Sequence, residues 1–395
     1  MTLADATAGQ PLEATWTDPK RYYWLMGLVI PAFPFLAWAL VGATGWRVFW
    51  WSGAIVLYGL FPFIDHVIGK DSVNPPDSAL AWLEQDRYYR WCTFLYIPLQ
   101  YGGLVFGCAL IASGRLDLVA RIGMTITLGG VSGIGINTAH ELGHKKESVE
   151  RWLSKITLAQ TCYGHFFIEH NRGHHVRVAT PEDPASARLG ESFWRFLPRT
   201  VFGSARNAWR LEAARLRRLD RSPWTFRNDV LNAWAMSVVL FAALAVAFGP
   251  GVLPYLVGQA IFGFCLLEVI NYTEHYGLLR QRLDSGRLER CAPRHSWNSD
   301  NVASNVFLYH LQRHSDHHAN PTRRYQALRH FEEAPELPTG YAGMIVMAYF
   351  PPVWFRVMDR RVLAAYQGDV TRANIQPSKR ARLLARYGAG AEGVA

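Results

Sequence analysis

The stretch Glu169-His170-Asn171-Arg172-Gly173-His174-His175 organises this chain, because three histidines in six residues are hard to explain as packing. On an α-helix, His170 and His174 stand at positions i and i+4 and share one face. His175 lies about 100° further round the helix. The segment can therefore aim three imidazoles into one small volume but not at one point, which suits two metal ions better than one. Neutral imidazole is the commonest nitrogen ligand for iron, zinc and copper, and the alternative is a solvated, histidine-rich turn.

The rest of the chain has the composition of a membrane protein. Of its 395 residues 50% are hydrophobic, and they come in long blocks that basic, polar segments separate. We predict an all-α, polytopic membrane protein with six transmembrane helices and a cytoplasmic, histidine-rich helical domain. In chain order we expect a cytoplasmic N-terminal segment (1–21), transmembrane helices one to four (22–139), a cytoplasmic histidine-rich segment (140–230), transmembrane helices five and six (231–273), a cytoplasmic C-terminal domain (274–380) and a flexible tail (381–395).

Six apolar blocks have the length of a membrane span, and they cover 22–43, 46–68, 91–112, 116–139, 231–248 and 251–273. Pro31 and Pro34 predict a kink in the first block, and the fourth can instead be a re-entrant segment. A further apolar run, 342–355, is shorter than a span, so we expect it on the surface or in the membrane interface. The first 19 residues are polar and no cleavage site follows the first block, so no secretory signal is expected.

The positive charges predict the orientation. Nearly all Lys and Arg residues lie in the N-terminus, the loop 69–90, the segment 145–229 and the C-terminal domain. The positive-inside rule makes these parts cytoplasmic, and six spans then place both termini in the cytoplasm. The 5 cysteines form no C-x-x-C pair, which argues against a zinc ribbon, an iron–sulfur domain and a disulfide framework.

Four separate regions offer histidines at this membrane face. His140 and His144 leave the fourth span, His275 leaves the sixth, and two further clusters lie in cytoplasmic segments. Nine neutral nitrogens are too many for one tetrahedral zinc ion, whereas two irons fit this number and leave positions open for oxygen. The sequence therefore predicts a di-iron centre. The expected ligands are His140, His144, His170, His174, His175, His275, His314, His317 and His318.

Four acidic residues flank these histidines, namely Glu141, Glu169, Glu274 and Asp316. We expect them to accept the second ring N–H of a ligand, and the alternative is that they are ordinary solvated acids. The remaining histidines are interpreted as structural or interfacial, namely His66, His165, His295, His310 and His330. His66 and its neighbour Asp65, at a helix end, are the best candidates for another role.

Four motifs carry a resemblance to a known family. They are His-Glu-Leu-Gly-His-Lys (140–145), Glu-His-Asn-Arg-Gly-His-His (169–175), Asn-Tyr-Thr-Glu-His-Tyr-Gly (271–277) and Leu-Gln-Arg-His-Ser-Asp-His-His-Ala (311–319). Together they resemble the signatures of bacterial membrane alkane 1-monooxygenases, over roughly residues 20–365. This group is related to the membrane fatty-acid desaturases, whose second motif is typically His-x-x-His-His. The longer spacing in residues 170–175 and the His-Tyr-Gly of residues 275–277 favour the hydroxylase branch.

The resemblance implies a reaction, a cofactor and a redox partner. Two irons held by the nine histidines would use O2 to hydroxylate the terminal methyl group of medium-chain n-alkanes to 1-alkanols. The electrons would come from a separate rubredoxin, itself reduced by a rubredoxin reductase, because this chain has no C-x-x-C pair. The protein would lie in the bacterial inner membrane. The alternatives are an aromatic-methyl (xylene-type) hydroxylase, a fatty acyl desaturase and, outside the enzymes, a metal transporter.

The basic surface and the second span offer further candidates. The net charge is +10, and a basic run can dock an acidic rubredoxin or attract anionic lipid headgroups. This run consists of Arg206, Arg210, Arg215, Arg217, Arg218 and Arg221. Nucleic acid is not an expected partner of an integral membrane protein. In the second span, Leu57, Tyr58 and Phe61 are candidates for lining a substrate channel and limiting chain length, with lipid contact or core packing as the alternative.

Overall fold

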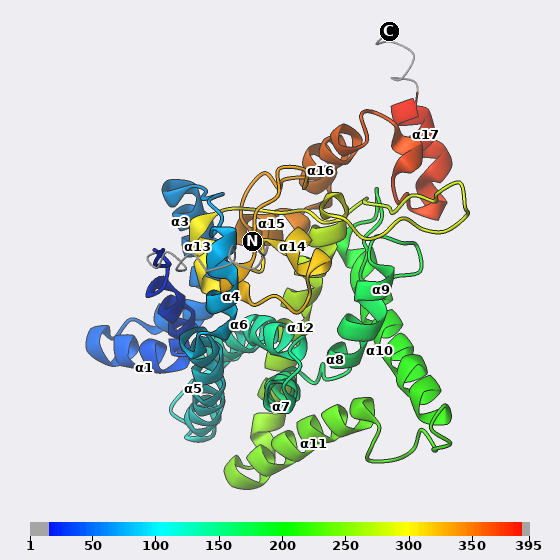
Figure 1. Ribbon diagram of the computed structural model, residues 1–395. Coiled ribbons are helices and arrows are strands. Elements are labelled where there is room, and N and C mark those ends of the chain that lie inside the picture. Colours follow the sequence, from blue (N-terminus) through cyan, green and yellow to red (C-terminus); the bar gives the residue numbers. More distant parts are fainter. Residues whose placement is uncertain (1–15, 389–395) are drawn as a thin grey trace, which may run out of the picture.

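The computed structural model describes residues 16–388, and in this range the chain is helical, with isolated β-bridges but no strand (Figure 1). Five helices are long and apolar enough to cross a membrane, or six if a bent pair near the N-terminus is one span. The predicted all-α fold with membrane-spanning helices is therefore confirmed. Of the predicted N-terminal segment and tail, residues 1–15 and 389–395 lie outside the described range.

The helices agree with the predicted spans to within a few residues. In the first span, the 3-10 helix η1 (Tyr23–Val29) and α1 (Phe33–Thr44) meet at 69°. The break contains Pro31, which has no N–H to continue the helical hydrogen bonds, so the predicted kink is confirmed. The other spans are Arg47–Ile68, α5 (Arg87–Ala112), α6 (Leu118–Gly143), α11 (Asp229–Phe248) and Pro250–His275, whose main part is α12 (Leu253–His275).

The second span is irregular. It consists of η2 (Arg47–Trp51), α2 (Ser52–Ile55), the π-helix η3 (Val56–Leu60) and α3 (Phe61–Ile68). Pro62 has no N–H to donate to the preceding turn, and the regular ladder is interrupted just before it. Such π-turns are often found at functional sites.

Close packing of α6 against α12 places the ends of both helices at one site. A Cβ atom at Gly129 or Gly133 would lie 2.9 Å from a backbone oxygen of α12, so only glycine permits this approach. More of α6 is buried than of any other span, and it is one continuous helix. The re-entrant alternative for 116–139 is therefore wrong. His140 near the end of α6 and His275 at the end of α12 emerge at the same end of the helix pair.

The remaining elements pack around and beyond these helix ends. In Figure 1, α14, α15 and α16 lie in the upper half of the molecule, whereas α5 and α11 lie at the bottom. The remaining α- and π-helices are α4 (Asp77–Gln85), α7 (Ser148–Leu158), α8 (Phe166–Ile168), the π-helix η5 (Glu169–His174), α9 (His175–Arg177), α10 (Phe193–Arg217), α13 (Val302–Phe307), α14 (His314–Ala319), α15 (Tyr341–Ala348), α16 (Pro351–Ala365) and α17 (Arg380–Gly388). The 3-10 turns are η4 (Ala159–Thr161), η6 (Pro250–Val252), η7 (Pro293–His295), η8 (Tyr325–Ala327), η9 (Val370–Arg372) and η10 (Pro377–Lys379).

Two predictions about the C-terminal part are wrong. The run 342–355 was expected on the surface or in the membrane interface, but α15 is largely buried against α12 and the second span. A short apolar helix is stable there because the neighbouring spans cover it, and the exposed residues of the run are Phe350, Pro352 and Val353 further along. Residues 381–388 of the expected flexible tail form most of α17, which is held in place by the buried Leu383.

Candidate metal centre

All nine predicted histidine ligands gather in one place, where they form two groups. The five-histidine group consists of His140, His144, His170, His175 and His317, and the four-histidine group consists of His174, His275, His314 and His318. Within each group the nitrogen atoms that face inwards all lie within 4.8 Å of one another. The side chains come from α6, from η5 with α9, from α12 and from α14. Four regions far apart in the sequence therefore meet, as predicted.

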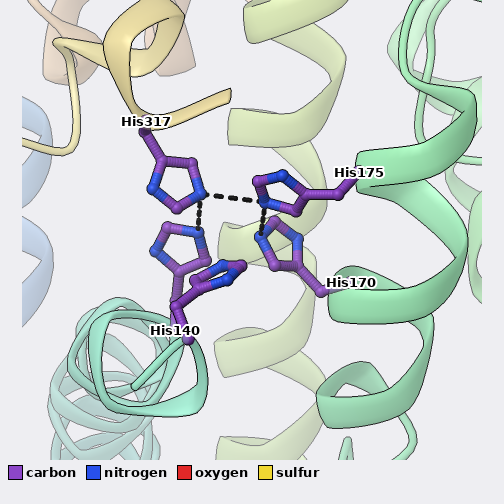
Figure 2. Close-up of side chains that lie close together, drawn as sticks. His140, His170, His175 and His317 are labelled. Atoms are coloured by element: carbon purple, nitrogen blue, oxygen red, sulfur yellow. Dashed lines mark hydrogen bonds between the residues drawn. The ribbon is translucent and has the colours of Figure 1, made fainter. Parts of the chain in front are cut away.

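The five-histidine group is compact (Figure 2). Nε2 of His317 lies 2.9 Å from Nε2 of His140 and 3.0 Å from Nε2 of His175. Nε2 of His175 also lies 3.0 Å from Nε2 of His170. The ring centroid of His144 lies 4.6 Å from those of His175 and His317, and its buried Nε2 has no hydrogen-bond partner.

The turn that carries three of the ligands is a π-helix rather than an α-helix. Backbone hydrogen bonds in a π-helix join residues i and i+5, and the N–H of His175 donates to the carbonyl of His170. His170 and His175 therefore belong to one group, whereas His174 belongs to the other. The predicted shared face of His170 and His174 is wrong. The expected division of the three imidazoles between two points matches the geometry.

The four-histidine group is built largely on α14. Nε2 of His318 lies 2.9 Å from Nε2 of His314 and 3.3 Å from Nε2 of His174. Nε2 of His275 lies 3.2 Å from Nε2 of His314. His314, His317 and His318 stand at positions i, i+3 and i+4 and share one side of the helix. Because His317 turns to the five-histidine group, this short helix contributes to both groups.

The charge state of the rings fits metal binding. Burial, with the charge of neighbouring rings, lowers the pKa of the histidines outside the spans well below the usual value, at His144, His170, His175, His314, His317 and His318. These rings are neutral, so each has a lone pair to offer. Two nitrogens bonded to one ion at about 2.1 Å lie roughly 3 Å apart when the bonds are near a right angle. The observed separations thus fit one metal ion in each group.

Sequence reasoning missed Asp183, which orients the candidate ligand His174. Its Oδ2 lies 2.8 Å from Nδ1 of His174 and accepts from the hydroxyl of Ser186 at 2.6 Å. Burial lowers the pKa of His174, but the Asp183 carboxylate outweighs burial and leaves that pKa raised. This contact turns Nε2 of His174 towards the other histidines. The sequence signal that could have pointed to Asp183 is its position in the acidic segment Pro181-Glu182-Asp183-Pro184, shortly after the histidine-rich turn 169–175.

Two of the predicted carboxylates, Glu141 and Asp316, anchor the segment 320–329 beside the site. Glu141 pairs with Nζ of Lys145 at 2.9 Å, and Lys145 also donates to the carbonyl of Arg323 at 2.9 Å. Asp316 accepts from Nη1 of Arg323 at 2.6 and 2.7 Å and from the N–H of Arg329 at 2.8 Å. Their predicted role as acceptors of a ligand's ring N–H is wrong, because these other donors occupy both carboxylates.

Glu169 has a similar bracing role in the π-turn. Arg177 Nη2 donates to its Oε1 at 3.1 Å, and Asn207 donates to its Oε2. The carboxylate lies over Gly173, where a Cβ atom would come within 2.5 Å of Oε2. These contacts replace the predicted contact with a histidine ring.

Glu274 is the one predicted carboxylate that contacts a ligand ring. Its Oε2 lies 3.3 Å from Nε2 of His314, and the hydroxyl of Tyr341 donates to its Oε1 at 2.8 Å. The prediction was that Glu274 accepts the second ring N–H of a histidine ligand. It instead faces the nitrogen that points into the four-histidine group, where it can add an oxygen donor.

The histidines that were left without a metal role lie outside both groups. Nδ1 of His165 accepts from Trp234 at 3.4 Å, and Nε2 of His295 lies 2.9 Å from Glu289. His310 donates to a backbone carbonyl, His66 is exposed, and His330 pairs with Asp300 in a separate cluster with Glu336. Asp65, beside His66, is fully buried and accepts from the N–H of Ser304 at 2.9 Å, which ties the second span to α13.

An apolar cavity connects the two histidine groups with the membrane-spanning helices. Its free volume is only about 50 Å³, so it is a narrow slot. His140, His170 and His314 line it together with apolar side chains of the second span, α6, α12 and α15. Leu57 and Phe61 line it as predicted. Tyr58 does not, since its hydroxyl lies 3.2 Å from that of Tyr349.

Comparison with known proteins identifies a family model and relatives that cover most of this chain. The fatty acid desaturase family model matches residues 118–348. An alkane 1-monooxygenase of Acinetobacter baylyi is 47% identical over 377 residues, which cover 94% of this chain and 92% of the relative. Alkane 1-monooxygenase 1 of Alcanivorax borkumensis is 47% identical over 374 residues, with the same coverage. The hydroxylase component of a xylene/toluene monooxygenase of Pseudomonas putida is 28% identical over 353 residues, 87% of this chain and 88% of the relative. The chain therefore belongs to the alkane 1-monooxygenase family, within the wider fatty acid desaturase family.

Proposed function

We propose that this protein is a membrane di-iron monooxygenase that hydroxylates the terminal methyl group of medium-chain n-alkanes. The balanced reaction is RCH3 + O2 + 2 e− + 2 H+ giving RCH2OH + H2O. The observation that carries the proposal is the narrow apolar slot lined by histidines of both groups. Relatives that cover nearly the whole chain are named alkane 1-monooxygenases, which supports the substrate class and the position of attack.

The slot suits an unbranched hydrocarbon. An alkane has no polar group to orient it, so the shape of the wall must present its end to the histidines. Leu57, Phe61 and Ile134 form an apolar part of that wall. The polar lining residues Asn137 and Asn271 lie within about one helical turn of His140 and His275. The polar end of the slot is therefore the histidine end, and its narrow width excludes water from the methyl group.

We infer iron from the donor set and the reaction together. Nine imidazoles suit iron, zinc or copper, but zinc has no redox chemistry. Two irons, one held by each histidine group, would supply the redox chemistry that activates O2. The chain's own residues position them: Asp183 orients His174, the π-turn divides His170 from His174, and Glu274 offers one carboxylate oxygen to the four-histidine group.

We infer that the electrons come from a separate, acidic rubredoxin reduced by a rubredoxin reductase. The sequence has no C-x-x-C pair, so it lacks the cysteine ligands for such a centre of its own. Its net charge of +10 favours encounter with an acidic protein. The donor brings both electrons of the balanced reaction, one at a time.

The basic run at 206–221 suits lipid headgroups better than it suits this donor. The loop after α10 exposes Trp224 and Phe226, which are 74% and 93% exposed, and the span α11 begins directly after it. Exposed aromatic side chains at the start of a span mark the membrane interface. Arg217, Arg218 and Arg221 are placed beside them and can contact anionic headgroups.

We place the histidine face and both termini on the cytoplasmic side of the bacterial inner membrane. The spans α6 and α12 both end at the histidines, so one face of the membrane carries the whole site. The segments next to it hold most of the Lys and Arg residues, whereas the loop between α5 and α6 holds only Arg115. The positive-inside rule then assigns the histidine face to the cytoplasm.

The test uses the full chain in lipid nanodiscs with octane, O2, NADH, rubredoxin and rubredoxin reductase. We expect 1-octanol as the product by gas chromatography with mass spectrometry, and one iron for each histidine group by elemental analysis. Parallel reactions receive p-xylene and a fatty acyl substrate. If the only product carries a new double bond, the protein is a desaturase and not a hydroxylase. If p-xylene is oxidised but octane is not, the substrate is an aromatic methyl group and not an alkane. Iron-free protein with full activity would refute the di-iron centre.

A metal transporter makes a different prediction. It would move iron across a proteoliposome membrane without consuming O2 or alkane. We expect no such transport, because the nine histidines gather at one end of the helices instead of following a path through them.

A further inference from the structure

We propose that the acidic electron donor docks in a basic groove between α16 and α17, and that electrons reach the metal centre through Tyr387, Asp359 and Tyr276. This inference rests on the proposed function, because it locates the redox partner of that reaction on the surface.

The groove combines positive charge with an apolar floor. Its volume is about 580 Å³, and its lining consists of Pro352, Phe355, Arg356, Arg360, Arg386 and Tyr387. The three arginines are exposed, and none forms a salt bridge within residues 16–388. Nζ of Lys379 lies 5.0 Å from the centre of the Phe355 ring and adds a further positive charge. A charged rim around apolar and aromatic contacts is the usual construction of a protein-docking surface.

Hydrogen bonds connect this groove with a metal ligand. The hydroxyl of Tyr387 donates to Oδ2 of Asp359 at 3.1 Å, and the hydroxyl of Tyr276 donates to Oδ1 at 2.7 Å. Asp359 and Tyr276 are buried, and Tyr276 directly follows His275 of the four-histidine group. Covalent bonds and hydrogen bonds carry electrons better than gaps between atoms do. The groove therefore lies at the outer end of a continuous contact path to the site.

The location of the groove favours a protein partner over lipid. In Figure 1, α16 and α17 lie at the opposite end of the molecule from the spans α5 and α11. The basic run at 206–221 lies instead beside the exposed aromatics Trp224 and Phe226 at the start of a span. An acidic protein approaching from the water phase meets the groove without competition from headgroups.

The strongest competing entry point is the surface over α9. Val176 is 66% exposed and directly follows the ligand His175. Two of its cationic neighbours are already paired, however. Arg172 pairs with Glu212 at 2.9 Å, and Arg177 pairs with Glu169 at 3.1 Å. A third, Arg280, donates to the carbonyl of Val176 at 3.0 Å, so this surface offers one such cation where the groove offers three arginines and attracts an acidic partner less strongly.

The docking test compares two matched sets of charge reversals in the full chain in nanodiscs. One set is Arg356→Glu, Arg360→Glu and Arg386→Glu in the groove, and the other, the α10 set, is Arg206→Glu and Arg210→Glu on α10 and Arg218→Glu at its C-cap. Binding of rubredoxin is measured by biolayer interferometry, and alcohol formation is measured against rubredoxin concentration and salt. We expect the groove set to raise the Kd and the KM for rubredoxin about tenfold or more and to flatten the salt dependence. Iron content reports that the variants still fold.

The docking test has clear contrary outcomes. A groove set that binds rubredoxin as tightly as the wild type refutes the proposal, as does a selective loss in the α10 set or in Val176→Glu. A loss of binding to anionic vesicles instead of to rubredoxin would make the groove a lipid site and would also refute it. Wild-type protein that turns over with dithionite but not with rubredoxin would refute the donor of the proposed function instead.

The electron path is tested separately with Tyr387→Phe, which keeps the ring and removes the hydrogen bond to Asp359. We expect a lower kcat at saturating rubredoxin with an unchanged Kd, because docking is intact and only the path is interrupted. Reduction by dithionite, which needs no docking, should keep the wild-type rate. An unchanged kcat in both Tyr387→Phe and Tyr276→Phe would refute the path.

Discussion

The Nε2 atoms of His170 and His175 lie 3.0 Å apart, although the residues are five positions apart in the sequence. On a regular α-helix such a pair would point roughly 140° away from each other. The π-turn of η5 brings them together and sends His174 to the four-histidine group. One additional residue in a single helical turn therefore decides which of the two histidine groups each of these histidines joins.

We expect His175→Ala to reduce the iron content from two to one per chain and to abolish alcohol formation. His175 contacts both His170 and His317 within its own group, so its removal opens the five-histidine group and leaves the other intact. Elemental analysis and product assays check this result. His66→Ala is the control, because His66 is exposed and lies outside both groups. Loss of both irons would show that the groups are not independent.

We expect Asp183→Ala to weaken iron retention about 10-fold to 100-fold, which is the usual effect of removing the partner of a ligating histidine. Without this carboxylate, Nδ1 of His174 loses its acceptor and the ring is free to turn. The rate of iron loss to a chelator measures the effect. Glu182→Ala changes the exposed neighbouring acid and should behave as the wild type. Equal rates in both variants would contradict the orienting role of Asp183.

We expect Leu57→Ala to shift the preference towards longer alkanes. Leu57, Phe61 and Ile134 lie between the slot and a second small hollow lined by Ile30 and Phe33. Shortening Leu57 joins the two spaces, and each additional methylene group that fits is worth about 1 kcal/mol or more. The ratio of kcat/KM for dodecane and octane measures the shift. Ile55→Ala, on an exposed position of the same span, should leave the ratio unchanged.

We expect removal of iron to destabilise the histidine region selectively. A ligand present at about 1,000 times its Kd stabilises the folded state by roughly 4 kcal/mol. Without it, histidine rings face one another at 2.9–3.3 Å with no ion between them, so 166–177 and 310–320 should exchange amide hydrogen faster. Hydrogen exchange measured by mass spectrometry checks this effect. Equal acceleration in α5 and α11 would point instead to general unfolding.

Periodic and compositional signals were sufficient to predict most of the fold. Each span is a block of apolar residues of the required length, and Pro31 marks the bend because a proline cannot continue the hydrogen-bond ladder. The position of 342–355 was not predictable in this way. A short apolar helix looks the same whether it lies in the membrane interface or between spans, and only the surrounding helices make α15 a wall of the slot.

The histidine spacing also predicted which residues gather, because nine imidazoles at the ends of two spans and in two nearby segments are typical of a metal site. It did not predict their partners. The carboxylates next to them in sequence, Glu141, Glu169 and Asp316, are held by Lys145, Arg177 and Arg323, respectively. Asp183 reaches His174 because the chain folds back after the π-turn.

By itself, the sequence determined that nine histidines are carried to one end of a set of membrane-spanning helices, because hydrophobic length and ligand spacing are local properties of the chain. The tertiary structure alone decided how those histidines divide into five and four, which carboxylate orients a ligand, and which residues of the second span face the slot. These features depend on one π-turn and on contacts between segments far apart in the chain. Distances between such segments are not encoded in any single stretch of residues.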